Sequence, residues 1–254
     1  MNGTEGGALP RAGGEDGALL VARGIAKRFG GVQALADVSF GIRKGEIYGL
    51  IGPNGAGKTT LFNVLTGIYP PDGGTFTFAG QTLGGLKPND VAARGIARTF
   101  QNIRLFGNLS ALENVMIGRH VRTRAGVFGA MLRDARTRRE EREIEKRAFE
   151  LLEYVGVQRR ANDLAKHLAY GDQRRLEIAR ALATEPKLLA LDEPAAGMNA
   201  TETGALKDLL EDIRRDGTTI LLIEHDMKLV MSVCDRVLVL DYGKKIAEGT
   251  AAEV

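Results

Sequence analysis

Residues 52–60, with the sequence GPNGAGKTT, carry the residue types and the spacing of a phosphate-binding loop. They fit the pattern G-x-x-x-x-G-K-[ST], in which a glycine-rich backbone precedes a lysine and a hydroxyl side chain. The apolar run at 47–51 predicts a buried strand before this loop, and residues 59–64 predict the start of a helix after it. Because the pattern needs that strand and that helix, its context favours a phosphate site over a chance glycine-rich turn.

Each residue type in this loop has a chemical reason to be there. Glycines at 52, 55 and 57 lack a Cβ atom, so successive backbone N–H groups can converge on an anion at a helix N-terminus. Lys58 supplies a positive charge for the phosphates, the Thr59 hydroxyl can bind Mg²⁺, and Thr60 can donate to a phosphate. The predicted nucleotide-binding residues of the loop are Gly52, Pro53, Asn54, Gly55, Ala56, Gly57, Lys58, Thr59 and Thr60.

Two adjacent carboxylates, Asp192 and Glu193, follow a second apolar run at 187–191. A charge at the end of a buried strand needs a metal ion or a hydrogen-bond partner, and Mg²⁺ held near phosphates is such a partner. Neighbouring side chains on a strand point in opposite directions, so one carboxylate can serve the metal while the next faces a water molecule. We therefore assign Asp192 to Mg²⁺ and Glu193 to polarising the attacking water.

Composition narrows the classes of protein that this chain can belong to. Its 254 residues are 44% hydrophobic, which fits one large α/β domain or a domain with a subdomain. A net charge of +3 does not demand a nucleic-acid partner, and we expect none. The sequence has no apolar run of about 18 residues, so no membrane span is expected. The single cysteine, Cys234, is expected to be buried, and residues 1–17 are expected to form a disordered tail.

Apolar runs alternate with helical patterns along the chain, which predicts a largely parallel sheet. Strands are expected at 19–25, 36–40, 47–51, 75–78, 187–191, 218–223 and 236–240, and helices at 90–97, 138–155, 174–183 and 202–215. A mainly helical insert interrupts the alternation between about 101 and 172. The Arg- and Glu-rich stretch at 119–147 predicts a solvated surface, with a partner contact as the alternative.

Three further segments resemble motifs of the ABC-type ATPases. Residues 168–175 (LAYGDQRR) look like the ABC signature loop, Gln101 resembles the Q-loop glutamine, and His225 resembles the switch histidine. With the two motifs above they follow the family's order, and the resemblance covers about residues 18–250. The resemblance implies an α/β fold, a P-loop NTPase core of ABC type with a mainly parallel sheet, an antiparallel β portion and an inserted helical subdomain. It implies one ABC ATPase domain at 18–254, with its core at about 18–100 and 173–254 and the helical subdomain at about 101–172.

The same resemblance implies roles for individual residues. Phe29 matches the aromatic side chain that stacks on adenine, with core packing as the alternative. Gln101 would bind Mg²⁺-bound water, and His225 would donate to the γ-phosphate or the attacking water. ATP and Mg²⁺ are the implied cofactors. The implied catalytic residues are Glu193, His225 and Gln101, the metal-site residues are Thr59, Gln101 and Asp192, and the signature residues that would reach a second subunit's ATP are Ala169, Tyr170, Gly171 and Asp172.

The signature loop departs from the family's commoner sequence Leu-Ser-Gly-Gly-Gln. Ala169 removes the serine hydroxyl, Tyr170 replaces a glycine, and Asp172 replaces the glutamine. A carboxylate at 172 would disfavour a phosphate nearby unless it points away. Asn199 likewise stands where an aspartate is usual. Because the phosphate loop and Glu193 are intact, we still expect an active site.

A finer resemblance is to the ATP-binding subunits of branched-chain amino-acid importers. It is carried by the AYG of residues 169–171, by residues 98–102 (RTFQN) and by the long basic insert that follows. It implies an ATPase that energises such an importer from the cytoplasmic face of the inner (plasma) membrane. The implied partners are transmembrane permease subunits, a second ABC ATPase that is a paralogue in preference to an identical copy, and indirectly an extracytoplasmic solute-binding protein. A soluble ABC ATPase of an assembly scaffold, such as one for iron–sulfur cluster biogenesis, is the alternative.

Overall fold

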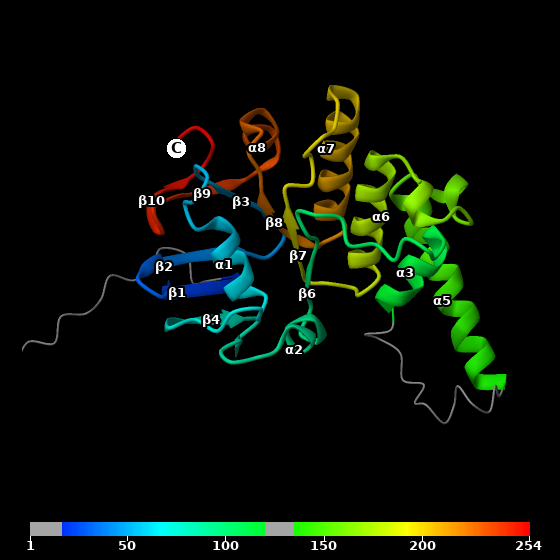
Figure 1. The fold of residues 1–254 in the computed structure, drawn as a ribbon, viewed down its shortest axis with the longest axis horizontal. Helices are drawn as coiled ribbons and strands as arrows, with labels where there is room; N and C mark the ends of the chain where they lie inside the picture. The colour runs from blue at the N-terminus through cyan, green and yellow to red at the C-terminus, as the bar shows by residue number, and fades with distance from the viewer. Residues whose placement is uncertain (1–16, 120–134) are drawn as a thin grey trace, which may run out of the picture.

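A computed structural model describes residues 17–119 and 135–254 of the chain. The predicted disordered tail, apart from Gly17, lies outside the described residues, and so does part of the basic insert. Two β-sheets occupy one end of the molecule and three of its helices gather at the other (Figure 1). The predicted α/β fold, with its parallel core, antiparallel portion and helical insert, is confirmed.

The larger sheet has six strands in the order β10-β9-β3-β8-β7-β6. All neighbouring strands are parallel except the antiparallel pair β9 and β10. Every residue of β3, β7 and β8 is buried, as expected for parallel strands that are covered on both faces. The strands are β3 (Ile47–Ile51), β6 (Ile96–Arg98), β7 (Leu188–Asp192), β8 (Thr219–Ile223), β9 (Arg236–Asp241) and β10 (Lys244–Gly249).

The smaller sheet has four antiparallel strands in the order β2-β1-β4-β5. They are β1 (Ala18–Phe29), β2 (Val32–Arg43), β4 (Gly73–Phe78) and β5 (Gln81–Thr82). Helix α1 (Lys58–Leu65) contributes Phe62 and Leu65 to the apolar core that this sheet shares with one face of the larger sheet. On that face Tyr48 and Leu50 of β3 point toward α1, whereas Ile47 and Ile51 point to the opposite core.

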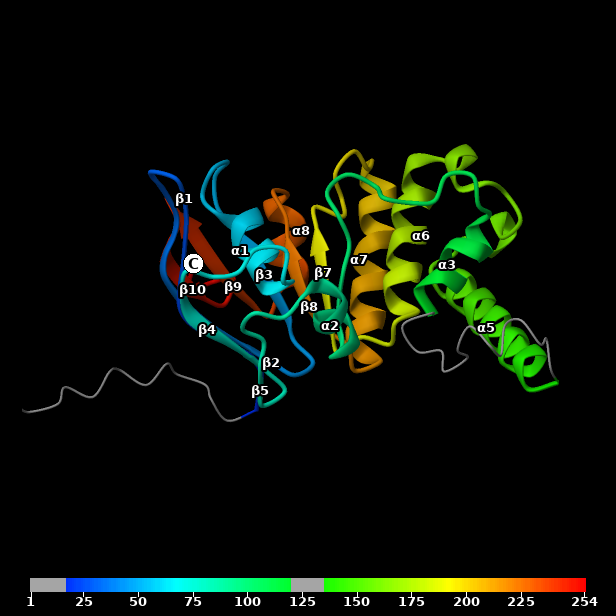
Figure 2. The same cartoon turned by 60° about the horizontal axis from the view of Figure 1, so that its bottom comes forward.

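The opposite core lies beneath helices α6 (Tyr170–Leu182), α7 (Ala200–Arg215) and α8 (Met227–Val233). Helix α7 lies between β7 and α6 in two views of the fold (Figures 1 and 2). Its N-cap Asn199 accepts from the Glu202 N–H and donates its own N–H to the Glu202 carboxylate, a complete capping box. Asparagine therefore serves as an effective helix cap at this position, where the family usually has aspartate.

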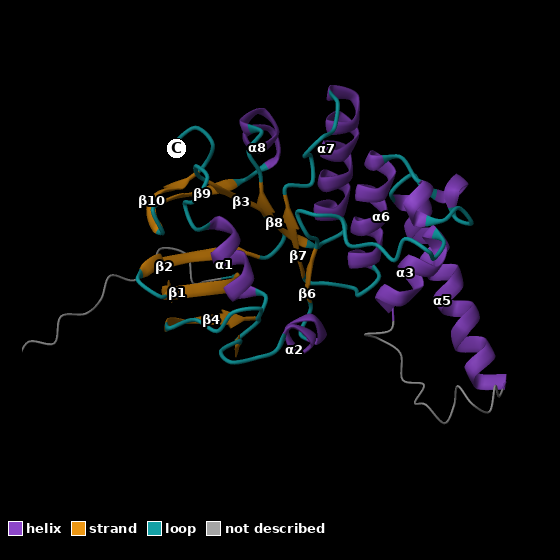
Figure 3. Ribbon diagram, in the orientation of Figure 1, coloured by secondary structure: helices purple, strands orange, loops and turns teal. Residues whose placement is uncertain are grey.

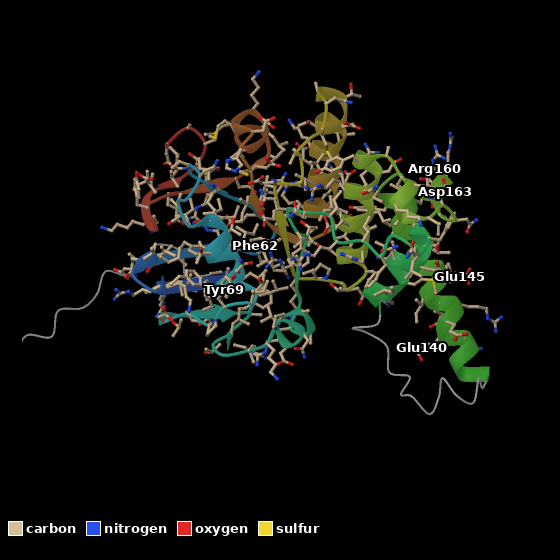
Figure 4. The ribbon with its side chains drawn as sticks, in the orientation of Figure 1. Phe62, Tyr69, Glu140, Glu145, Arg160 and Asp163 are labelled. Carbon is tan, nitrogen blue, oxygen red and sulfur yellow. The ribbon has the colours of Figure 1, made fainter. Side chains whose placement is uncertain are left out.

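The helical end of the molecule contains α3 (Ala111–Arg119), α5 (Ala135–Tyr154) and the N-terminal part of α6, with single 3₁₀ turns at Gln158–Arg160 and Ala165–His167 (Figure 3). Helix α3 packs against both α5 and α6. Glu140 and Glu145 lie along α5, far from Phe62 on α1 (Figure 4). The predicted subdomain boundary at 172–173 falls inside α6, and the division into core and helical subdomain stays a prediction.

The structure corrects some of the expected elements. The helix expected at 90–97 is wrong in its second half, because α2 (Pro88–Ala93) ends early and Ile96–Arg98 forms β6. Gly95, with a φ of 105°, separates the two elements. Helix α6 begins four residues before the expected start at 174. Helix α8 and strand β10 were not expected, and α3 lies within the expected helical insert without having been expected individually.

Cys234 is buried, as expected from its apolar surroundings. Within residues 17–119 and 135–254, none of the helices combines the length and the apolar character that crossing a membrane requires.

Candidate functional site

The phosphate loop follows directly from β3 and leads into α1. Gly52 and Gly57 have φ angles of 147° and 98°, which L-residues rarely adopt. A Cβ atom at Gly52 would lie 2.1 Å from the Leu240 carbonyl oxygen, and one at Gly57 would lie 2.6 Å from that of Ala34. The glycines are therefore required by both the backbone conformation and the close approach of neighbouring strands.

Lys58 is the first residue of α1, and its side chain turns back over the phosphate loop. Its Nζ atom donates to the carbonyl oxygens of Gly52 at 2.7 Å and Pro53 at 3.0 Å. Burial lowers the pKa of Lys58, while the nearby carboxylates of Glu193 and Asp192 act in the opposite direction. The ammonium group thus lies among the backbone groups of the predicted phosphate cradle.

Glu193 contacts both Gln101 and His225, so the three predicted catalytic side chains lie together. The Gln101 Nε2 atom donates to Glu193 Oε2 at 3.0 Å, and His225 Nε2 lies 2.7 Å from Glu193 Oε1. Glu193 has a φ of 49°, in the left-handed region that a non-glycine residue seldom occupies. The Glu193 N–H donates to the carbonyl oxygen of Ile223 at the end of β8. The parallel neighbours β7 and β8 thus bring Glu193 and His225 together.

The predicted metal donors have the chemistry that Mg²⁺ prefers. Asp192 is 3% exposed, and burial raises its pKa, with Arg98 the largest opposing charge. A buried carboxylate in this environment is stabilised by a cation. No cluster of three or more His, Cys, Asp or Glu side chains able to hold a metal occurs in the described part of the chain. The Thr59 hydroxyl, the Gln101 amide oxygen and the Asp192 carboxylate are oxygen donors of the kind that Mg²⁺ accepts when it shares its coordination with substrate phosphates.

A pocket of about 400 Å³ contains most of these groups. Phe29 does not line it; the Phe29 ring is 43% exposed and packs edge-on against Tyr69 at 5.2 Å. Tyr242, in the turn between β9 and β10, lines the pocket and was not expected from the sequence. The lining residues are Val32, Gln33, Ala34, Asn54, Gly55, Ala56, Gly57, Lys58, Thr59, Thr60, Gln101, Glu193, His225 and Tyr242.

The signature residues lie outside this pocket, at the N-terminus of α6. Ala169 is the N-cap, and Asp172 lies in the first turn, where the helix dipole favours a carboxylate. A Cβ at Gly171 would lie 2.8 Å from Glu202 Oε1, and one at Gly197 would lie 3.2 Å from the Tyr170 ring. The signature loop therefore packs against Gly197 and against Glu202 at the start of α7 of the same chain.

Arg174 on α6 joins the signature helix to the backbone around Gln101. It donates to the carbonyl oxygens of Phe100, at 2.8 Å, and Gln101, and to the Tyr170 hydroxyl at 2.9 Å. Glu177, 1% exposed, pairs with Arg174 at 3.4 Å and accepts from the Phe100 N–H. Sequence reasoning missed this link because Arg174 and Glu177 are more than 70 residues from Phe100 and Gln101, although charged residues among the apolar residues of the helix expected at 174–183 were a signal of it.

Replacing Arg174 by methionine is expected to lower the free energy of unfolding by about 3 kcal/mol, because Glu177 would stay buried without the nearer of its two arginine partners, Arg174 and Arg180. The double variant Arg174→Met/Glu177→Leu should recover most of that loss. Urea unfolding measures both. As a control, Lys207→Met removes one partner of the exposed Lys207–Glu211 pair and should change stability by less than about 1 kcal/mol. Equal losses from Arg174→Met and Lys207→Met would contradict the importance of the buried pair.

A second groove, of about 530 Å³, runs between the core and the helical end. The Phe100 ring lies between the guanidinium groups of Arg98 and Arg104, each 4.4 Å from its centroid. Phe106, 51% exposed, lies beneath Arg180. The groove thus combines aromatic and aliphatic walls with three arginines. Its apolar lining includes Ile68, Val91, Ile96, Phe100, Phe106 and Ile117.

Comparisons with known proteins agree with this geometry. The family model described as ABC transporter matches residues 35–196. The chain is 48% identical over 237 residues to the high-affinity branched-chain amino acid transport ATP-binding protein LivG of Salmonella typhimurium, covering 93% of each protein.

Solved structures of transporter cassettes share the fold. The ADP conformation of MJ1267, an ATP-binding cassette of an ABC transporter, superposes with a TM-score of 0.81 at 32% identity and covers 93% of this chain and 92% of that one. The dimeric structure of MJ0796, a bacterial ABC transporter cassette, has a TM-score of 0.79 at 26% identity and covers 91% of this chain and 98% of that one. The chain therefore belongs to the ABC transporter family, and it is one of the ATP-binding ATPases of that family.

Proposed function

We propose that this ATPase energises an ABC importer for branched-chain or related amino acids. The observation that carries the proposal is the 48% identity to LivG over 93% of both chains. The AYG sequence at 169–171 and the RTFQN sequence at 98–102 lie within that shared region. The alternative, a soluble ATPase of an assembly scaffold, is not favoured, since nearly the whole chain resembles a transport subunit.

Within the site, we assign Glu193 to polarising the attacking water and His225 to donating to the γ-phosphate or that water. The hydrogen bonds of Glu193 to Gln101 and His225 support these roles, because they hold three polar side chains around one point. Lys58 and the backbone N–H groups of the phosphate loop bind and orient the phosphates. Thr59, Asp192 and Gln101 would hold Mg²⁺, which would supply positive charge against the phosphates when bound. Phe29 remains our candidate for stacking on adenine.

We propose that a second ABC ATPase subunit completes each site. Residues 169–172 lie outside the pocket that contains Lys58 and Glu193, so the signature loop cannot serve the same chain's nucleotide in this conformation. The N–H groups at the start of α6 suit an anion supplied by another subunit. MJ0796, a cassette with the same fold, forms a dimer. We favour a paralogue over an identical copy, following the resemblance to the branched-chain group.

The groove beside Gln101 is our candidate for the permease contact. It lies beside the core strand β6 and helix α3, and the backbone of Phe100 links it to Arg174 and the signature helix. Its arginines and aromatic rings suit a short protein segment that carries apolar and acidic side chains. Binding there would bring the chain to the cytoplasmic face of the inner membrane as a peripheral subunit, with an extracytoplasmic solute-binding protein acting indirectly through the permease.

The variant Phe106→Asp should reduce co-purification with permease subunits by about 10-fold or more, because an exposed aromatic ring that the permease would cover would become a charge. ATP affinity should stay within about twofold of the wild-type value, since Phe106 does not line the nucleotide pocket. Affinity purification from detergent-solubilised membranes measures the first quantity. Ile246→Asp is the matched control, because Ile246 is 63% exposed on β10 and does not line the groove. Equal permease recovery with the two variants would contradict the assigned surface.

The function itself is tested by identifying every protein that co-purifies with the chain and then measuring uptake of leucine, isoleucine and valine. Recovery of permease subunits and uptake that depends on the chain would support the proposal. Recovery of soluble scaffold proteins without any permease would overturn it and favour the alternative.

A further inference from the structure

Glu224 is a buried carboxylate to which the catalytic assignment gives no role. It is 4% exposed and immediately precedes His225. Its Oε1 atom accepts the N–H of Ala195 at 2.7 Å, and its Oε2 atom accepts the N–H of His225 at 3.0 Å. One side chain thus bonds two loops that follow different strands, β7 and β8.

Backbone N–H groups stabilise the negative charge of the Glu224 carboxylate. Burial raises its pKa, and hydrogen bonds from the N–H groups of Ala195, His225 and Asp226 oppose that rise. Within the described residues, no Lys, Arg or His side chain forms a salt bridge with it. A carboxylate in such a position depends on these N–H groups, so the loops that carry them are restrained in turn.

The two loops carry the proposed catalytic pair. Ala195 is two residues after Glu193, and His225 adjoins Glu224 in sequence. The Glu193 N–H also bonds to the Ile223 carbonyl at 2.9 Å, and the side chains of Glu193 and His225 meet at 2.7 Å. Glu224 therefore closes a ring of contacts that fixes one loop against the other.

We propose that Glu224 is a positioning residue that holds the His225 imidazole against Glu193 by bonding the Ala195 and His225 amides at once. This inference rests on the proposed roles of Glu193 and His225. Gly197, two residues after Ala195, also packs against Tyr170 of the signature loop, so Glu224 connects His225 with the segment on which that loop packs. Glu224 does not line the pocket that contains Lys58 and Glu193, so it would act through His225.

The substitution Glu224→Gln tests this link, because an amide offers one acceptor oxygen and a donor NH₂ where the carboxylate offers two acceptors. One of the two loop amides would then lose its partner. We expect the maximal ATPase rate of the complete transporter to fall by about 10- to 100-fold while the Kd for ATP stays within about twofold. Glu224→Asp keeps the charge but is one methylene shorter, so its rate should lie between those of Glu224→Gln and the wild type.

A double-mutant cycle with His225→Ala separates positioning from a general structural effect. Adding Glu224→Gln to His225→Ala should change the rate less than about twofold, because the group that Glu224 positions is gone. The matched control is Glu46→Gln, which neutralises another buried carboxylate, at the start of β3 and away from the pocket. Glu46→Gln should leave the maximal rate within about twofold. Thermal unfolding of each variant checks that the folded state persists.

The possible outcomes are distinct. Wild-type turnover of Glu224→Gln beside an impaired His225→Ala would overturn the inference and leave the proposed function intact. Equal losses from Glu224→Gln in the wild-type and His225→Ala backgrounds would also overturn it. Wild-type turnover of His225→Ala would contradict the role proposed for His225 and, with it, the positioning role.

Discussion

The variant Glu193→Gln is expected to lower the maximal ATPase rate of the complete transporter by at least about 100-fold, while ATP affinity changes by less than about twofold. The amide has nearly the same shape as the carboxylate and can still accept from Gln101 Nε2, so the pocket is preserved. It lacks the negative charge that polarises a water molecule in the transition state. Steady-state phosphate release measures the rate, and titration calorimetry measures the affinity.

A control for Glu193→Gln is Glu150→Gln on α5, which removes an exposed charge that pairs with Arg147 at 3.1 Å. That variant should keep the wild-type rate. Because Glu193 lies within hydrogen-bond distance of both Gln101 and His225, a fall in ATP affinity equal to the fall in rate would mean that the pocket had been disrupted. Unchanged turnover in the complete assembly would reject Glu193 as the polarising group.

The phosphate loop could be predicted from sequence because its chemistry is local. Nine consecutive residues supply the glycines, the lysine and the hydroxyl groups, and the apolar run before them is long enough to mark a buried strand. The contacts of Gly52 with Leu240 and of Gly57 with Ala34 were not predictable in this way. These contacts depend on the positions of β9 and β2 beside the phosphate loop, and those positions follow from the order of the strands in the two sheets.

Elements with weak periodicity were missed or misassigned. Strand β10 is largely polar and partly exposed, so it lacks the apolar run that marked β7 and β8. The stretch at 90–97 contains three alanines and an arginine, which favour a helix, yet Ile96 pairs with Leu188 and belongs to the sheet. Tertiary pairing overrides helical propensity at this position, and Gly95 provides the break.

The catalytic side chains could be assigned by resemblance, but the residues that hold their loops in place could not. Gln101, Glu193 and His225 each sit in a recognisable motif, and the structure brings the three together. Arg174 and Glu224 make their contacts through backbone amides and carbonyls of distant loops. Nearly every residue offers the same backbone N–H and C=O groups, so the sequence does not indicate which of these groups a side chain will bind.

The variant Lys58→Ala is expected to weaken ATP binding by about 10- to 100-fold, in contrast to Glu193→Gln. Hydrogen bonds to charged groups contribute about 1.5–3 kcal/mol, and Lys58 is the cation whose Nζ lies within the phosphate loop, at 2.7 Å from the Gly52 carbonyl. Titration calorimetry with ATP measures the loss. The exposed Lys44, replaced by alanine, controls for the change in net charge and should leave the affinity unaltered.

Lys58→Ala could weaken ATP binding in two ways, by removing the positive charge or by loosening the phosphate loop. The Lys58 side chain is 6% exposed and bonds to Gly52 and Pro53, so its removal could also loosen the loop. Lys58→Met keeps most of the volume of the side chain but removes its charge. If loss of charge is the cause, this variant should bind ATP as weakly as Lys58→Ala. If Lys58→Met binds ATP like the wild type, the ammonium group does not hold the phosphates, and the assignment of residues 52–60 as the nucleotide site would be wrong.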